Sequence, residues 1–126
     1  MHKSRLGGLI IDCQTDDLGV AENFWTQALG YSTRASDHPD DEGYLLLDTS
    51  PDEPYIEIQK VTHPNRVHLD IETNDVEAEV TRLVKLGAVR VEAVSDWWVM
   101  QAPSGHRFCV IPAGPGRLDH RAQVWD

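Results

Sequence analysis

Titratable and apolar side chains alternate in the stretch RVHLDIET, residues 66–73. Successive side chains on a β-strand point to opposite faces, so His68 and Asp70 would share one face while Leu69 and Ile71 share the other. A histidine beside a carboxylate can move protons or bind a metal ion. The pattern therefore predicts either a solvent-facing strand or a strand that lines a polar binding site, and the residues alone leave both interpretations open.

An internal repeat contains this strand. The segment IIDCQTDD at residues 10–17 aligns with HLDIETND at residues 68–75, which pairs Asp12 with Asp70. An amphipathic helix follows each copy and ends in Leu-Gly, and three β-like runs follow each helix. The sequence therefore predicts two strand-helix-strand-strand-strand (βαβββ) modules.

The helix boundaries carry local signals. Asp16 or Asp17 is the expected N-cap of the first helix, and Gly30 is its expected end. Asn74 is the expected N-cap of the second helix, and Gly87 is its expected end. We expect module one to span about 6–60, module two about 66–112 and a C-terminal tail 113–126, all within a single domain of residues 1–126.

Composition excludes several classes of protein. A net charge of -10 argues against a nucleic-acid partner and against an anionic membrane surface. The apolar run near the N-terminus ends at Asp12 and is too short for a signal peptide or a membrane span, so the expected location is cytoplasmic. Cys13 and Cys109 are the only cysteines, and we expect both as free thiols.

Three segments resemble the vicinal oxygen chelate superfamily, also called the glyoxalase / bleomycin-resistance / extradiol dioxygenase fold, and in particular its small glyoxalase-like proteins. They are DDLGVAENFWTQALGY, VHLDIETNDVEAEVTRLVKLGA and APSGHRFCVIP. The resemblance implies an α+β fold in which two tandem βαβββ modules form a cup-shaped mixed sheet with the helices on the outside. It also implies a homodimer.

The same resemblance implies which side chains line the cup. His68 and Asp70 would face inward, while Val67, Leu69 and Ile71 would pack under the second helix. The inward residues of the other strands follow from the repeat. We expect Glu57 and His68 as catalytic residues and Asp12, Asp70, Trp98, Arg107 and Cys109 as ligand-binding residues.

Metal-dependent members of the superfamily hold an ion with four positions, which correspond here to Ile10, Glu57, His68 and Cys109. Isoleucine cannot coordinate an ion, and only Glu57 and His68 match the usual ligands of the superfamily. About three protein ligands are normal for a catalytic ion, so we expect no metal and no other cofactor. A contribution from Cys109 or Asp12 would restore the alternative of zinc, nickel or iron.

The expected function is therefore a metal-free glyoxalase-like protein that binds a small organic molecule of unknown identity. The alternative is a lyase or isomerase in which Glu57 is the general base and His68 is the acid or the electrophile, with or without a divalent metal. The acidic charge disfavours small anions in general, and Arg107 is the inward cation that could hold a carboxylate. An interaction module without a ligand is the third class considered.

Overall fold

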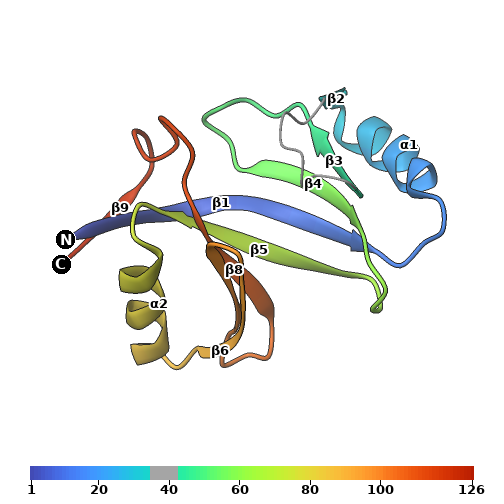
Figure 1. Ribbon diagram of the computed structural model, residues 1–126. Coiled ribbons are helices and arrows are strands. Elements are labelled where there is room, and N and C mark those ends of the chain that lie inside the picture. The colour runs from blue at the N-terminus through green and yellow to red at the C-terminus, as the bar shows by residue number, and fades with distance from the viewer. Residues whose placement is uncertain (35–42) are drawn as a thin grey trace. The chain divides into compact units, whose positions relative to one another are not determined.

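The computed structural model describes residues 1–34 and 43–126 (Figure 1). These residues form two compact units. The module-one unit is Gly8–Val67, and the module-two unit combines Met1–Gly7 with His68–Asp126. The long first strand, β1 (His2–Cys13), contributes its first half to the module-two unit and its second half to the module-one unit. The acidic composition of residues 37–42, DHPDDE, predicts a solvated surface connection, and this segment lies outside the described residues.

The module-one unit is a small mixed sheet with one helix. The second half of β1 pairs in parallel with β4 (Tyr55–Lys60), which pairs antiparallel with β3 (Tyr44–Leu47). β3 pairs antiparallel with the short β2 (Thr33–Arg34). The helix α1 (Leu18–Leu29) follows β1 and packs against β4. Strand, helix and three strands thus occur in the predicted order.

The module-two unit repeats this plan and adds a strand from the tail. β5 pairs in parallel with β8, β8 and β7 pair antiparallel, and β7 and β6 pair antiparallel. The last strand, β9, pairs antiparallel with the start of β1, which brings the two chain ends together (Figure 1). The elements are β5 (Arg66–Thr73), α2 (Val76–Lys85), β6 (Val89–Val94), β7 (Trp97–Gln101), β8 (Arg107–Pro112) and β9 (Gln123–Trp125).

These two units confirm the α+β class, the mixed sheet and the βαβββ order of both modules. The predicted cup shape depends on how one module is placed against the other, so it stays a prediction. No helix in the described ranges is both long enough and apolar enough to cross a membrane.

The helix ends follow the local signals with one exception. Asp17 caps α1 by accepting a hydrogen bond from the Gly19 amide at 2.9 Å, and Gly30 ends the helix with a φ of 78°. The cap of α2 is Asp75, not the predicted Asn74, because the Asn74 side chain instead accepts a hydrogen bond from the Lys3 amide at 2.8 Å.

A hydrophobic core lies between α2 and the module-two sheet. The helix covers β6, β7 and β8, and Ile71 of β5 packs at the margin of this core. The prediction that Val67 and Leu69 also pack there is wrong, because these side chains are 57% and 44% exposed. The fully formed core consists of Val80, Ala88, Met100, Phe108 and Val110.

Candidate functional site

Three side chains with metal-ligand chemistry meet on the face of the module-two sheet that is opposite α2. They are His68 and Asp70 of β5 and Cys109 of β8, and their ligand atoms all lie within 4.8 Å of one another. The His68 Nε2 atom is 3.6 Å from Oδ1 of Asp70, and these two side chains are only 14% and 11% exposed. We call these three residues the His-Asp-Cys cluster.

Strand register explains why the cluster forms. β5 and β8 run in parallel with Asp70 directly beside Cys109, and His68 is two residues before Asp70 on the same face. The neighbours Ile71 and Val110 point the other way and contribute to the core under α2. The same alternation that buries the apolar side chains therefore gathers the polar ones.

The next strand continues this polar face. Val99 of β7 lies beside Cys109, and Gln101 lies beside Arg107. Extending the β5–β8 register by one residue also puts Arg107 beside His68. The cluster thus has an arginine and an amide as neighbours on one side, and Val99 as an apolar neighbour.

The other end of the face is closed by the C-terminal tail. Arg117 pairs with Glu72, with 2.8 Å between Nη2 and Oε1, and it also donates to the Gly7 carbonyl oxygen at 3.1 Å. Gly7 is required there, because a Cβ atom at this position would lie 2.3 Å from Cγ of Glu72. Arg5 donates from Nη1 to the Arg117 carbonyl oxygen at 3.0 Å and so anchors the tail. Glu72 followed from the alternation of β5, whereas the position of Arg117 had no signal in the sequence.

Two predicted site residues lie in the module-one unit. Asp12 is 2% exposed, and its Oδ2 atom is 3.5 Å from Nε of Arg66 and 3.9 Å from Nε2 of His63. Glu57 is half-buried on β4 and is in register with Ile10 of β1, which is 1% exposed. The pairing with Ile10 means that the neighbouring strand position offers no second metal ligand to Glu57.

Trp98 lies on the opposite face from the His-Asp-Cys cluster. Its register partner is Val110, it packs against the core under α2, and its indole nitrogen donates to Glu77 Oε1 at 3.3 Å. The prediction that Trp98 shares the polar face is therefore wrong. The other of the two adjacent tryptophans, Trp97, lies on the same face of β7 as Val99 and Gln101, because residues two positions apart on a strand share a face.

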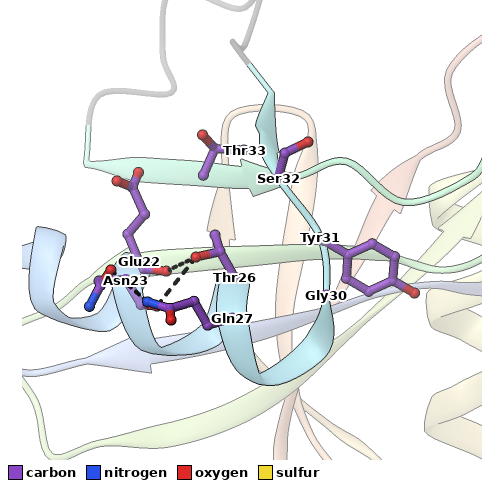
Figure 2. A pocket seen from close by; sticks show the side chains of 8 residues that line it. All are labelled: Glu22, Asn23, Thr26, Gln27, Gly30, Tyr31, Ser32 and Thr33. Carbon is purple, nitrogen blue, oxygen red and sulfur yellow. Dashed lines mark hydrogen bonds between the residues drawn. The ribbon is translucent and has the colours of Figure 1, made fainter.

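A separate polar pocket of about 460 Å³ occurs in the module-one unit, at the C-terminal end of α1. Figure 2 shows that two of its polar side chains already bond within the helix, since Thr26 donates to the Glu22 carbonyl at 2.8 Å and Gln27 to the Asn23 side chain at 2.8 Å. None of the predicted site residues lines this pocket. Its lining consists of Glu22, Asn23, Thr26, Gln27, Gly30, Tyr31, Ser32 and Thr33.

The donor set of the His-Asp-Cys cluster fits a divalent ion. Imidazole nitrogen, carboxylate oxygen and thiolate sulfur together suit a borderline-soft ion such as zinc. Metal-ligand bonds of about 2.0–2.3 Å place the donors of a tetrahedral ion roughly 3–4 Å apart. The His68 and Asp70 ligand atoms, 3.6 Å apart, meet this requirement, and all three ligand atoms of the cluster lie within 4.8 Å of one another.

Two βαβββ modules, each a mixed sheet with one helix, define the vicinal oxygen chelate class of fold. The sequence model of the family described as "Glyoxalase-like domain" matches residues 8–111. The chain belongs to this glyoxalase-like family. Among curated proteins, none matches the chain.

Several solved structures share the fold. A methylmalonyl-CoA epimerase in complex with methylmalonyl-CoA and NH4+ is 16% identical, with a TM-score of 0.58 over 89% of this chain and 96% of that chain. The methylmalonyl-CoA epimerase of Mycobacterium tuberculosis is 18% identical, with a TM-score of 0.60 over 86% of this chain and 88% of that chain. A hypothetical protein from Bacillus halodurans C-125 is 11% identical, with a TM-score of 0.65 over 98% of this chain and 99% of that chain. At these identities the likeness establishes the fold alone.

Proposed function

We propose that the chain is a glyoxalase-like protein that binds a small organic molecule at the His-Asp-Cys cluster, and that the cluster holds a divalent metal ion, preferably zinc. The observation that supports this proposal is the convergence of three ligand atoms within 4.8 Å on the face of β5 and β8 that is opposite α2. The expectation of a metal-free protein rested on two matching ligands, Glu57 and His68, with Cys109 or Asp12 as a possible addition and without Asp70. The proposal replaces it because Asp70 and Cys109 add two donors beside His68.

The residues of the cluster have separate roles in this proposal. Such an ion would polarise an oxygen atom of the bound molecule. The Asp70 carboxylate, 3.6 Å from the imidazole, would supply an anionic oxygen ligand beside the neutral nitrogen of His68. The low exposure of both side chains limits access of bulk water, which strengthens electrostatic interactions at the site. Cys109 would supply the anionic sulfur that favours zinc over magnesium or calcium.

Cobalt substitution tests the metal site directly. Co²⁺ bound by a thiolate gives an intense near-ultraviolet charge-transfer band, so we expect this band when Co²⁺ is added to the purified protein and expect zinc to abolish it by displacement. Cys109→Ser should remove the band, and His68→Ala should weaken Co²⁺ binding by about 10- to 100-fold.

The second cysteine provides a matched control. Cys13 lies in the module-one unit, where burial and the Asp12 carboxylate raise the pKa of its thiol. Cys13→Ser should therefore leave the Co²⁺ band unchanged. A parent protein without the band, or a band that depends on Cys13 rather than Cys109, would refute the proposed metal site.

An isomerase is the second candidate, favoured by the structural likeness to methylmalonyl-CoA epimerases. In this proposal His68 would exchange a proton with the substrate, and Glu57 stays the predicted partner base. Incubation with thioesters of 2-methyl-substituted acids in D2O, followed by NMR, would show deuterium entering the carbon next to the thioester carbonyl. Equal exchange in the parent and in His68→Ala would exclude this role for His68.

The assembly and location belong to the same proposal. We keep a cytoplasmic homodimer as the expected state, and light scattering at low micromolar concentration would measure the mass of the particle in solution. A monomer at this concentration would contradict the dimer without affecting the proposed metal site, since all three residues of the cluster lie in one unit of one chain.

A further inference from the structure

We infer that the molecule bound at this site is a small carboxylate, and that Arg107 is the residue that binds its carboxylate group. This inference rests on the proposed function for the location of the site. It adds the chemical class of the ligand and a specificity-determining residue outside the His-Asp-Cys cluster.

Arg107 lies close to the His-Asp-Cys cluster, on the same face of the module-two sheet. It lies on β8 two residues before Cys109, so the two side chains leave the same face about 7 Å apart along the strand. The extended β5–β8 register puts it beside His68, about 5 Å away across the sheet. A molecule with one oxygen on the cluster would therefore have its next polar group close to Arg107.

Three other arginines of the module-two unit already have partners within the protein. Arg82 forms an ion pair with Glu79, and Arg117 forms one with Glu72. Arg5 donates to backbone carbonyls of the tail. Among the described residues of this unit, no carboxylate pairs with Arg107, although its side chain is half-buried. A half-buried guanidinium without an internal carboxylate keeps its fork of N–H donors available for an external one.

The surroundings narrow the ligand further. Gln101 is in register with Arg107 and can add a neutral hydrogen bond to the same anion, while Val99 beside Cys109 favours a short apolar carbon chain. Glu72, an acid at the far end of this face, is already paired with Arg117 and does not compete for Arg107. With a net charge of -10 on the whole chain, anion binding needs such a local cation.

The probe for this inference is malonate, compared with malonamide, which has similar size and no charge. Isothermal titration calorimetry is run on metal-free and on zinc-loaded protein. We expect the parent to bind malonate at least tenfold more tightly than malonamide, and Arg107→Gln to lose about 10- to 100-fold of the malonate affinity. Added salt should weaken malonate binding and leave malonamide binding nearly unchanged.

Arg90→Gln is the matched control, because Arg90 is also a strand arginine of this sheet. Its guanidinium lies 5.8 Å from the ring centre of Trp98, so it belongs to the opposite face. This variant should bind malonate as the parent does. Circular dichroism melting of both arginine variants would show whether either change alters folding.

The possible results separate this inference from the proposed metal site. Malonate binding that depends on Arg107 in metal-free protein, together with no Co²⁺ band, would support the carboxylate receptor and refute the metal. A Co²⁺ band that depends on Cys109, with equal malonate affinity in the parent and Arg107→Gln, would support the metal and overturn this inference. A parent that binds malonate no better than malonamide would also overturn it.

Discussion

Glu79 of α2 is a buried carboxylate on which the stability of the module-two unit should depend. It has no exposed surface. His2 from the start of β1 lies 2.9 Å from Oε1, and Arg82 donates to both carboxylate oxygens, at 2.8 Å and 2.9 Å. Removing the charge would leave the Arg82 guanidinium beside a neutral group, so we expect Glu79→Gln to destabilise the fold.

The size of the effect follows from the pKa of Glu79. Burial alone would raise this pKa, but the hydrogen bonds from Arg82, His2 and Ser4 outweigh burial and lower it from 4.5 to about 2. The difference between these two pKa values corresponds to about 3 kcal/mol of stability at neutral pH. Glu79→Gln should therefore lower the free energy of unfolding by about 3 kcal/mol at pH 7.

The pH dependence has a defined sign. Because the folded-state pKa is lowered, the contribution of Glu79 is fully present above pH 4.5 and is lost as the pH falls from 4.5 toward 2. Urea unfolding of the parent and of Glu79→Gln, followed by circular dichroism at pH 7, 5 and 3, should show a stability gap that narrows only between pH 5 and pH 3.

Glu77→Gln serves as the control on the same helix. The Glu77 carboxylate is exposed and accepts one hydrogen bond from Trp98 at 3.3 Å. We expect this change to cost less than about 1 kcal/mol. The electrostatic explanation would be refuted if the difference in unfolding free energy between the parent and Glu79→Gln stayed constant from pH 7 to pH 3. A difference no larger than that for Glu77→Gln would also refute it.

Two further changes test how the C-terminal tail is held. Gly7→Ala places a Cβ atom against Glu72, so it should lower the free energy of unfolding in urea by about 1–3 kcal/mol. Gly114→Ala should leave this free energy nearly unchanged, because the nearest atom to its Cβ would be 3.8 Å away. Equal costs would show that the close approach at Gly7 is unimportant. Trp125→Leu removes the ring that lies 3.7 Å from the Arg82 guanidinium and should cost about 0.5–2 kcal/mol, and an unchanged melting temperature would contradict this contact.

The sequence alone determined the local structure of both modules. Asp16 or Asp17 was predicted to begin α1 and Gly30 to end it, and Asp17 and Gly30 do so, because capping and a positive φ are properties of single residues. The alternation in β5 placed His68 and Asp70 on one face, because side-chain direction on a strand has a period of two. The repeat then predicted the order of strands and helices in each module.

The tertiary structure alone decided which residues from distant strands became neighbours. Asp70 lies beside Cys109 only because β5 and β8 pair in this register, and counting ligands along the sequence left Asp70 out of the metal set. The register of β7 on β8 turned Trp98 toward α2, where either of two adjacent tryptophans was possible. The period-two alternation of a strand determines which side chains share a face. Hydrogen bonds and packing between strands determine the register, and the register of β5 on β8 brings the residues of the His-Asp-Cys cluster together.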